Sequence, residues 1–349
     1  MLAVRMYKPK DLRVEDVPIP SPGEGEALLR ILAVGICGSD IPRVNTYGAY
    51  HYPLTIGHEF SACIEALGAN TAGFHTGQRV TVAPMLPCGT CRACREGQYS
   101  MCDHYDYFGS RRDGAMAEYL ASPVANLLPL PDRVNDQAGA MVDPCANAVH
   151  ALTQAGFQSG DSVCVYGAGP IGLFAVQCAK AMRASKVIAV DIDERKLAVA
   201  KACGADAVID GRVETAAAAV RELLDGGANV VLDVAGTPVS QLNCIHSAAK
   251  GGRVVFVGIS HRGLELDAKT VDAVMRRQLR VTGSWNSFTA PFPGADWTTS
   301  IRLMDAGQID AGPIVSHVLP LREAPDIFRQ IDEKTLFFNK VLFLPQQKA

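Results

Sequence analysis

The sequence predicts an α/β protein with two domains, one of which contains a doubly wound parallel sheet. Its 349 residues exceed the usual size of a single domain, so each of two domains could bury its own core. Residues 148–284 alternate short apolar runs with helical patterns, which is typical of parallel strands joined by crossover helices. Residues 1–147 carry short apolar runs separated by turns, which predicts an irregular, β-rich domain.

Composition limits the kinds of partner. Hydrophobic residues make up 48% of the chain, charged residues 20%, and the formal net charge is −3. Because the sequence has no long basic run, we expect no nucleic acid and no membrane as a partner, and a small molecule instead. The N-terminal residues lack the apolar core of a signal peptide, and the longest apolar run, residues 163–179, is interrupted by three glycines and a proline. We therefore expect a cytoplasmic protein.

The first domain is predicted from short strands in chain order. Apolar residues bounded by turns predict strands at 27–34, 61–68 and 79–82. Three prolines, Pro18, Pro20 and Pro22, lie in one early connection, where a missing N–H group matters least.

The second domain is predicted to contain six strands with helices between them. Their apolar runs lie near residues 162–166, 186–190, 207–209, 229–233, 253–257 and 279–283. After residue 283 the alternation ends, and the tail predicts a helix around 297–305 and a final strand near 340–344. We expect this tail to return to the first domain, so that residues 1–147 and 285–349 form one domain and residues 148–284 the other.

A glycine fingerprint directly follows the first strand of the second domain. It reads Gly167-Ala168-Gly169-Pro170-Ile171-Gly172. In this pattern Gly167 permits the tight turn, Gly169 lets the backbone approach a pyrophosphate, and Gly172 lets the next helix pack against the strand. The phosphates would meet the N-terminus of that helix, which predicts a dinucleotide site.

The nature of the dinucleotide is indicated by an acidic residue. Asp191 lies 19 residues after Gly172, at the end of the next predicted strand. Its carboxylate would accept hydrogen bonds from the adenosine ribose and repel a 2′-phosphate, which favours NAD over NADP. Lys196 could reach the same ribose. The alternatives are that the glycines form an ordinary turn, that Asp191 caps a helix, and that Lys196 is a solvated lysine.

Four of the eleven cysteines are concentrated in one loop, residues 88–102. They are Cys88, Cys91, Cys94 and Cys102. Four thiolates saturate a tetrahedral zinc ion and leave no position for chemistry, so we expect a structural zinc; an iron–sulfur cluster is the alternative. Six further cysteines are scattered along the chain, mostly in apolar surroundings, and are expected to be reduced core residues.

A second metal site is predicted between residues 34 and 59. Cys37, His58 and Glu59 offer a thiolate, an imidazole and a carboxylate. This ligand set suits zinc and leaves a coordination position for water or substrate. Each residue alone is ambiguous, because a single cysteine beside a strand is usually a core residue and Gly-His-Glu can form a turn.

Taken together, these motifs resemble the zinc-containing medium-chain dehydrogenase/reductase superfamily over essentially the whole chain. The chain is similar to its polyol dehydrogenase branch in three stretches: Cys37-Gly38-Ser39-Asp40-Ile41-Pro42-Arg43, Tyr107-Phe108-Gly109-Ser110-Arg111-Arg112-Asp113-Gly114, and Gly283-Ser284-Trp285-Asn286 continuing to residues 291–294. The resemblance implies a GroES-like catalytic domain and a Rossmann domain. It also implies that Cys37 and His58 bind a catalytic zinc, with Glu59 as a ligand or near neighbour.

The resemblance also implies a further carboxylate near the hinge between the domains. That branch usually has Glu before Pro, whereas this chain has Asp143 before Pro144. Aspartate is one methylene shorter, so Asp143 could reach zinc through water, or it could simply form a turn.

The chemistry implied is oxidation of an alcohol. Zinc would acidify the substrate hydroxyl and NAD would take the hydride. Ser39 could start a proton relay, although its alternative is turn chemistry; the histidine that continues the relay in many relatives is replaced by Pro42. Asp40 is expected to orient the zinc ligands through hydrogen bonds.

We therefore predict NAD- and zinc-dependent oxidation of a secondary alcohol of a polyol or polyol phosphate to the ketose, with two zinc ions per chain. A threonine- or simple-alcohol-type dehydrogenase is the alternative, and a non-catalytic sensing protein a more distant one. The candidate substrate contacts are Arg43, Arg111 and Arg112 for a phosphate and His51 and Asn286 for hydroxyl groups; the arginines could instead be ordinary surface residues. The resemblance also implies a homodimer or homotetramer.

Overall fold

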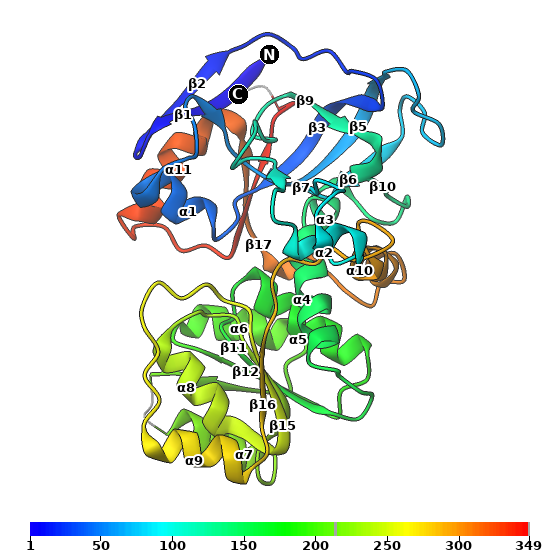
Figure 1. Cartoon of the computed structure of the whole chain (residues 1–349). Coiled ribbons are helices and arrows are strands. Elements are labelled where there is room, and N and C mark those ends of the chain that lie inside the picture. Colours follow the sequence, from blue (N-terminus) through cyan, green and yellow to red (C-terminus); the bar gives the residue numbers. More distant parts are fainter. Residues whose placement is uncertain (213–214, 348–349) are drawn as a thin grey trace. The chain divides into compact units, whose positions relative to one another are not determined.

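The computed structural model describes residues 1–212 and 215–347. The chain forms two compact units. The first contains Met1–Asp143, Phe288–Asp305 and Val315–Ala349, and the second contains Pro144–Ser287 and Ala306–Ile314 (Figure 1). The chain therefore leaves the first unit, builds the second, and returns twice. The predicted functional domain limits, 1–147 with 285–349 and 148–284, stay a prediction.

The second unit is built on a six-stranded parallel sheet. Its strands are β11 (Ser162–Tyr166), β12 (Lys186–Asp191), β13 (Ala207–Asp210), β14 (Ala228–Asp233), β15 (Ala248–Phe256) and β16 (Arg280–Gly283). Their order is β13-β12-β11-β14-β15-β16, so the direction of winding reverses between β11 and β14. This is the Rossmann order, and the carboxyl ends of strands near such a reversal form a crevice suited to a dinucleotide. All six predicted strands are confirmed.

Helices follow most of these strands, as the alternating pattern predicts. The helices that follow β11 to β15 are α5 (Pro170–Ala181), α6 (Glu194–Ala202), α7 (Ala216–Leu223), α8 (Pro238–Ser247) and α9 (Ala268–Arg276), and α4 (Val142–Gln154) precedes β11. Parallel strands that helices cover on both faces are apolar in sequence, because both faces are buried. The buried residues of this sheet include Val163, Ile188, Val231 and Val254. The predicted fold class is confirmed.

The first unit is centred on a seven-stranded sheet with the order β10-β6-β5-β3-β18-β17, with β9 pairing β3. The bounds of these strands are β3 (Glu26–Gly35), β5 (Glu59–Leu67), β6 (Arg79–Val82), β9 (Tyr119–Pro123), β10 (Leu127–Pro129), β17 (Val315–Pro320) and β18 (Lys340–Leu344). The central strand β3 pairs with three neighbours, because a bulged, twisted strand can present its two halves to different partners.

Smaller elements complete the first unit. They are a second sheet of β1 (Leu2–Lys8), β2 (Asp11–Asp16) and β4 (Leu54–Thr55), and the helices α1 (Asp40–Pro42), α3 (Asp136–Gly139), α10 (Ala295–Asp305) and α11 (Ala324–Asp332). The predicted tail helix and final strand are confirmed as α10 and β18.

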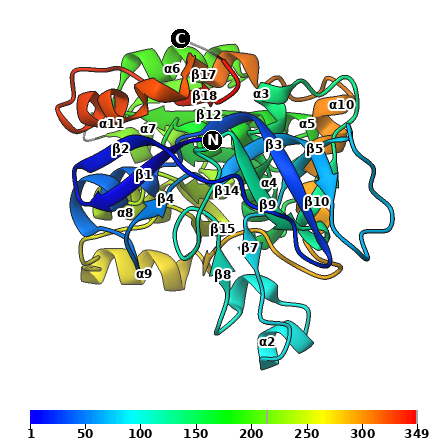
Figure 2. The same cartoon turned by 90° about the horizontal axis from the view of Figure 1, so that it is seen from above.

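A separate lobe projects from the β7–β8 hairpin (Figure 2). Its elements are β7 (Met85–Leu86), α2 (Arg92–Arg95) and β8 (Asp106–Tyr107). Ser100 anchors the lobe to the returning chain, because its Oγ accepts the amide of Phe288 at 2.8 Å and lies 3.2 Å from the carbonyl of the same residue. The lobe is therefore fixed at its base although α2 has only one turn.

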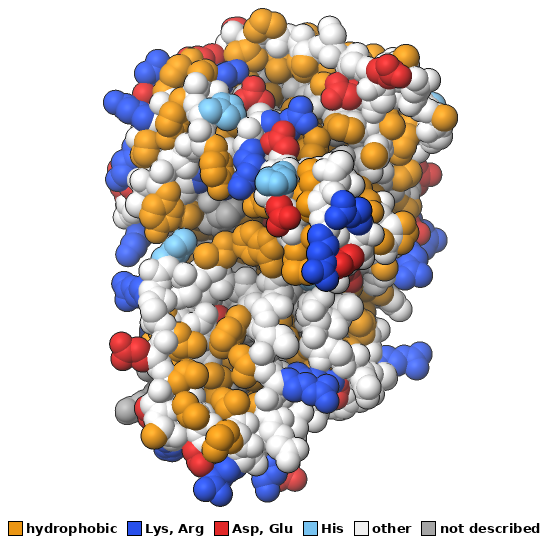
Figure 3. Space-filling view, in the orientation of Figure 1, with side chains coloured by type: hydrophobic (Ala, Val, Ile, Leu, Met, Phe, Trp, Pro, Cys, Tyr) orange, Lys and Arg blue, Asp and Glu red, His pale blue; other side chains and the backbone are white. Residues whose placement is uncertain are grey.

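The visible face of the molecule carries charges of both signs. Figure 3 shows acidic and basic side chains interspersed over the visible face, as expected for a net charge of −3. Within the described residues, none of the helices combines the length and the apolarity that crossing a membrane would need.

A buried ion pair joins the last strand to the middle of the first unit. Lys340, at the start of β18, donates from Nζ to a carboxylate oxygen of Glu59 and to the carbonyl of Ile36 at 2.9 Å. Lys340 is 1% exposed and Glu59 is 3% exposed. Gly35 lies between them: a Cβ there would come within 3.1 Å of the Glu59 carboxylate and 3.3 Å of the Lys340 side chain. The missing side chain on β3 thus makes room for the pair.

We expect Lys340→Met to lower the free energy of unfolding by about 3–5 kcal/mol, because it leaves the Glu59 carboxylate buried and uncompensated. Chemical denaturation monitored by circular dichroism would measure this change. Lys10→Met is the matched control, since Lys10 forms an exposed pair with Asp332 at 2.8 Å and such pairs contribute no more than about 1 kcal/mol. Equal effects of the two substitutions would contradict the assignment.

Candidate metal and cofactor sites

The four cysteines of the lobe form a compact tetrahedral group. The Sγ atoms of Cys88, Cys91, Cys94 and Cys102 all lie within 4.8 Å of one another. The Cys88–Cys94 and Cys91–Cys102 separations are both 3.9 Å. A disulfide needs about 2 Å, whereas four sulfurs about 2.3 Å from one zinc ion are roughly 3.8 Å apart. The geometry therefore fits a tetrahedral tetrathiolate metal site and excludes disulfides.

Backbone amides prepare these sulfurs to carry negative charge. Cys88 Sγ accepts the amide of Cys91 at 3.4 Å, and Cys91 Sγ accepts the amide of Cys94 at 3.5 Å. Amides of Thr90 and Cys91 lower the pKa of Cys88 to about 5, whereas burial raises the pKa of Cys94 to about 12. A bound cation is what lets all four sulfurs be thiolates together.

The second predicted ligand group is also brought together. The ligand atoms of Cys37, His58 and Glu59 lie within 4.8 Å of one another. Cys37 lies two residues after the end of β3. His58 directly precedes β5 and Glu59 begins it, and β5 pairs with β3 through Gly35 and Glu59. Sheet pairing therefore joins residues that are 21 positions apart in the chain. A sulfur, an imidazole nitrogen and a carboxylate oxygen at this spacing fit a zinc ion with room for a further ligand.

Two neighbours of Cys37 orient this group. The Ser39 hydroxyl lies 3.3 Å from Cys37 Sγ, and Asp40 accepts the amide of Cys37 at 3.0 Å. Asp40 is completely buried, and its other carboxylate oxygen lies 3.5 Å from His58 Nδ1. This places Asp40 behind the imidazole, as expected for a residue that fixes the orientation of a ligating histidine.

The charges in this group are strongly coupled. Burial would raise the pKa of Asp40, but the neighbouring His58 lowers it overall. Burial would lower the pKa of His58, but Asp40 and Cys37 raise it well above its ordinary value. The raised pKa favours the protonated imidazole beside the Asp40 carboxylate when no metal is bound. A divalent cation would take the place of that proton.

The two candidate carboxylates differ in their surroundings. One oxygen of Glu59 is held by Lys340, so only the other is free to approach a metal. Asp143 lies in the first turn of α4, is 5% exposed, and is not a member of the group within 4.8 Å among the described residues. Its charge nevertheless acts on Tyr107, so Asp143 lies close to the group.

Tyr107 is a site residue that our sequence reasoning did not single out. Its ring meets the His58 ring edge-on, with centroids 5.5 Å apart and an interplanar angle of 71°. Burial, followed by the negative charges of Asp143 and Cys37, raises the pKa of Tyr107 well above its ordinary value. The phenol therefore stays protonated and can donate a hydrogen bond at the site. Lys340 is the other such residue; a lysine within an otherwise apolar strand was the available signal.

The candidate substrate residues separate into three groups. Arg111 and His51 lie together, since His51 Nε2 is 3.1 Å from the carbonyl of Arg111. Arg112 is instead paired with Asp106 at 3.5 Å. Arg43 lies near Asp40, where its charge, together with the larger effect of His58, lowers the pKa of that carboxyl. Asn286 lies in the second unit, with a φ of 53° that asparagine tolerates better than most residues.

The glycine fingerprint has the conformation that a dinucleotide requires. Gly167 has a φ of +101°, and a Cβ there would come within 2.8 Å of the amide nitrogen of Ala235. A Cβ on Gly172 would lie 1.9 Å from the carbonyl oxygen of Gly167, whereas one on Gly169 would meet no atom within 4 Å. Gly167 and Gly172 therefore serve packing, and Gly169 leaves open space at the N-terminus of α5, which begins with Pro170 and Ile171.

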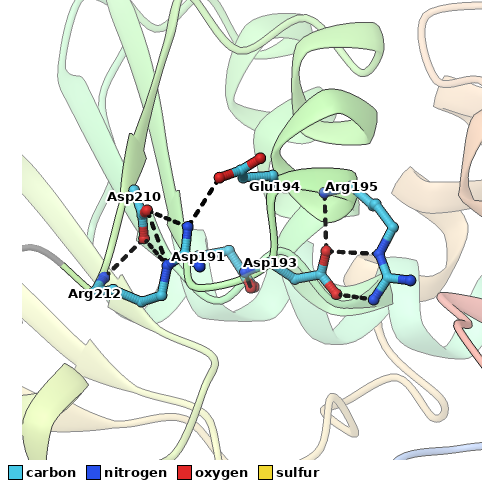
Figure 4. A network of polar contacts seen from close by, with 6 residues as sticks. All are labelled: Asp191, Asp193, Glu194, Arg195, Asp210 and Arg212. Carbon is cyan, nitrogen blue, oxygen red and sulfur yellow. Dashed lines mark hydrogen bonds and ion pairs between the residues drawn. The ribbon is translucent and has the colours of Figure 1, made fainter. Parts of the chain in front are cut away.

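Asp191 connects this turn to the end of β12. Its carboxylate accepts the amides of Ala168 at 2.6 Å and Asp193 at 2.9 Å. Nearby arginines are engaged with carboxylates: Arg195 with Asp193, and Arg212 with Asp210 and Glu194 (Figure 4). Lys196 lies on α6, in the turn that follows.

Two family models match the chain. A model described as an alcohol dehydrogenase GroES-like domain matches residues 23–132, and a model described as a zinc-binding dehydrogenase matches residues 170–306.

Curated relatives match along nearly the whole length. Galactitol 1-phosphate 5-dehydrogenase from Escherichia coli (strain K12) is 36% identical over 338 residues, covering 96% of this chain and 97% of that protein. L-galactonate-5-dehydrogenase from the same strain is 34% identical over 343 residues, covering 96% and 97%. L-threonine 3-dehydrogenase from Chromobacterium violaceum is 32% identical over 311 residues, covering 88% and 89%.

Solved structures show the same fold. The crystal structure of galactitol-1-phosphate dehydrogenase from Escherichia coli has a TM-score of 0.94 at 35% identity, covering 99% of this chain and 100% of that one. A Sinorhizobium meliloti 1021 structure bound to NADP has a TM-score of 0.90 at 29% identity, and an Escherichia coli CFT073 alcohol dehydrogenase complexed with NADH has a TM-score of 0.89 at 27% identity; each covers 99% of both chains. With its GroES-like and Rossmann folds and these relatives, the chain belongs to the zinc-dependent alcohol dehydrogenases of the medium-chain dehydrogenase/reductase superfamily.

Proposed function

We propose that this dehydrogenase oxidises a secondary alcohol of a polyol or polyol phosphate to the ketose, with NAD as the acceptor. The observation that carries the proposal is the group formed by Cys37, His58 and Glu59, which offers three ligands and leaves room for a fourth. Two relatives are named for oxidation at position 5 of galactitol 1-phosphate and of L-galactonate, which supports an extended polyhydroxylated substrate.

Cys37 and His58 would hold the catalytic zinc, with Glu59 as a third ligand through its free oxygen and Asp143 as a nearby carboxylate. When bound, zinc supplies Lewis acidity that lowers the pKa of a substrate hydroxyl, and NAD supplies the hydride acceptor. Asp40 keeps the imidazole of His58 oriented, and Lys340 holds the carboxylate of Glu59 in place within the core.

Ser39 is positioned to receive the proton that the substrate hydroxyl loses. Its hydroxyl lies 3.3 Å from Cys37 Sγ and is therefore at the edge of the ligand group. Pro42 carries no titratable group, so the proton must continue from Ser39 through water. Tyr107 has an O–H donor on the His58 side of the group, where it can hold a substrate oxygen in place.

NAD is favoured over NADP by the charges at the end of β12. Asp191 presents a carboxylate where the adenosine ribose is expected, together with Lys196. Arg195 and Arg212, the cations that could otherwise balance a 2′-phosphate, are already paired with Asp193, Asp210 and Glu194. Gly167, Gly169, Pro170, Ile171 and Gly172 would bind the pyrophosphate.

We also propose a homodimer or homotetramer. Strand β16 is the edge of the Rossmann sheet, and all four of its residues are exposed. An open sheet edge pairs readily with the edge strand of a second copy. The cytoplasmic location stays a prediction from the sequence.

A substrate panel tests the proposed reaction. The purified zinc-loaded protein would be offered sugar alcohols, their phosphates, L-threonine and simple alcohols, each with NAD and with NADP, while the absorbance of the reduced nicotinamide is followed. Turnover confined to threonine or to simple alcohols would overturn the polyol assignment. Preference for NADP would overturn the role given to Asp191.

We expect Cys37→Ser to lower kcat by at least about 1000-fold, because a hydroxyl replaces a thiolate ligand of the catalytic zinc. Zinc analysis should fall from about two ions per chain to about one, while the circular dichroism spectrum is kept. Cys63→Ala, at a buried cysteine of β5 outside both ligand groups, is the control and should keep both zinc ions. Full activity of Cys37→Ser would refute the zinc site.

Cys91→Ser should act mainly on stability. Loss of one thiolate opens the lobe site, and the zinc content again falls to about one ion per chain. The thermal midpoint should fall further than in Cys37→Ser, because the lobe has too small a core to hold its loop without the metal. Differential scanning calorimetry of both variants would measure this order, and the reverse order would contradict a structural role.

The two neighbouring glycines should have opposite effects. We expect Gly172→Ala to lower stability by about 1–3 kcal/mol, since its Cβ would overlap the carbonyl of Gly167. Gly169→Ala should change stability by less than about 1 kcal/mol but weaken NAD binding at least about tenfold, because its Cβ would fill the space intended for the pyrophosphate. Thermal unfolding and fluorescence titration with NADH would separate the two effects, and unchanged NADH affinity of Gly169→Ala would contradict the site.

A further inference from the structure

We propose that Arg111 binds an anionic group, a phosphate or a carboxylate, at the far end of the substrate's carbon chain, and so selects polyol phosphates or sugar acids over neutral polyols. This inference rests on the proposed function and adds the residue that determines specificity. Three observations support it. The backbone of Arg111 is fixed next to the candidate zinc site, and its side chain packs on aromatic rings. Its guanidinium has no carboxylate partner among the described residues.

The backbone of Arg111 is fixed onto Tyr107. The carbonyl of Tyr107 accepts the amides of Arg111 at 3.0 Å and of Ser110 and Arg112 at 3.3 Å. The turn is closed on its other side by the amide of Gly109, which donates to the carbonyl of Arg112 at 2.9 Å. Since the Tyr107 ring packs against His58, the position of Arg111 is tied to the candidate zinc site.

Close packing prevents this turn from moving away from the site. A Cβ on Gly109 would come within 2.7 Å of the backbone of Gly57, and one on Gly114 within 2.1 Å of the Gly57 carbonyl. Gly57 directly precedes His58. The segment from Tyr107 to Gly114 therefore lies directly against the chain that carries a zinc ligand.

The side chain of Arg111 packs on two aromatic rings. Its guanidinium carbon lies 4.4 Å from the centroid of the Tyr50 ring and 4.2 Å from that of the Tyr105 ring. Tyr105 in turn packs edge-on against Tyr107, with centroids 6.2 Å apart. Rings packed on a guanidinium restrict its motion and favour its charge, but these contacts do not use its N–H groups.

The guanidinium of Arg111 lacks a carboxylate partner among the residues that the structure describes. Other arginines of the first unit that stack on a ring also form an ion pair: Arg112 lies over Phe108 and pairs with Asp106, and Arg13 lies over Tyr7 and pairs with Asp11. Arg111 has the stacking contacts without the anion. A planar cation held in this way is suited to bind a phosphate or carboxylate through two parallel hydrogen bonds.

The approach to Arg111 is open to solvent. Tyr50 is 67% exposed, and Arg111 itself is partly exposed. A substrate whose hydroxyl lies at the zinc ligands could therefore extend along Tyr107 and Tyr105 and place its terminal anion at Arg111. Neutral polyols have only a hydroxyl at that end, which gains less from a cation than a charged group does.

Steady-state kinetics with three substrates of equal carbon number test this proposal. They are a neutral hexitol, its 1-phosphate and a six-carbon aldonate, each at saturating NAD. For the wild-type protein we expect kcat/KM for at least one anionic substrate to exceed that for the hexitol by about tenfold or more. The phosphate and aldonate arms then distinguish the two anions.

Arg111→Gln should lower kcat/KM for the preferred anion by about 10- to 100-fold, chiefly by raising KM. The loss in kcat/KM for the neutral hexitol should be at least about tenfold smaller than the loss for the anion. For the preferred anion, kcat/KM of Arg111→Lys should lie between the values of the wild-type protein and of Arg111→Gln. Lysine keeps the positive charge but lacks the planar, bidentate guanidinium. Arg13→Gln is the matched control: it also removes an arginine stacked on a tyrosine, and it should keep the anion preference.

Inhibition by inorganic phosphate provides a second test. It should compete with the hexitol in the wild-type protein and do so less well in Arg111→Gln. Equal losses for neutral and anionic substrates in Arg111→Gln would show a merely structural role and overturn the proposal. So would a wild-type protein that oxidises the hexitol best and is not inhibited by phosphate, although the proposed function would stand. Absence of turnover in all three arms would overturn the proposed function itself.

Discussion

The first unit depends on the buried ion pair between Glu59 and Lys340. Burying a single carboxylate or a single ammonium group has a large desolvation free energy, and pairing the two charges offsets much of it. The pair lies across β3, where Gly35 leaves the necessary space, and it joins strands from opposite ends of the chain. His58 precedes Glu59, so the same contact fixes the start of β5. The group formed by Cys37, His58 and Glu59 is therefore held in place by a lysine that lies outside it.

Much of the architecture could be predicted from the sequence because its signals are local. Each strand of the Rossmann sheet is a short apolar run between helical patterns, and all six runs were recognisable; β15 begins earlier than expected, at Ala248, where two glycines weakened the pattern. The four cysteines of the lobe lie within fifteen residues, so their grouping is nearly dictated by spacing. The resemblance to the zinc dehydrogenases, now confirmed by the relatives, supplied the pairing of Cys37 with His58.

The remainder of the site depends on contacts between distant segments, which a single sequence does not reveal. Lys340 reads as one charged residue in an apolar strand, and only the parallel and antiparallel pairing of β18 shows that it faces Glu59. The three candidate arginines were equivalent in the sequence. The structure separates them, because Arg112 has an acidic partner and Arg111 packs on aromatic rings contributed by two different loops. Charge alone identifies neither role.

The discontinuous path of the chain has a consequence for protein synthesis. A ribosome makes Glu59 long before it makes Lys340, and the whole second unit, Pro144–Ser287 with Ala306–Ile314, is translated in between. During that interval the central sheet of the first unit lacks β17 and β18, and the carboxylate of Glu59 has no ammonium group to neutralise it. The nascent chain can thus complete the parallel sheet of the second unit early, whereas the first unit gains its last strand only when residues 340–344 have left the exit tunnel.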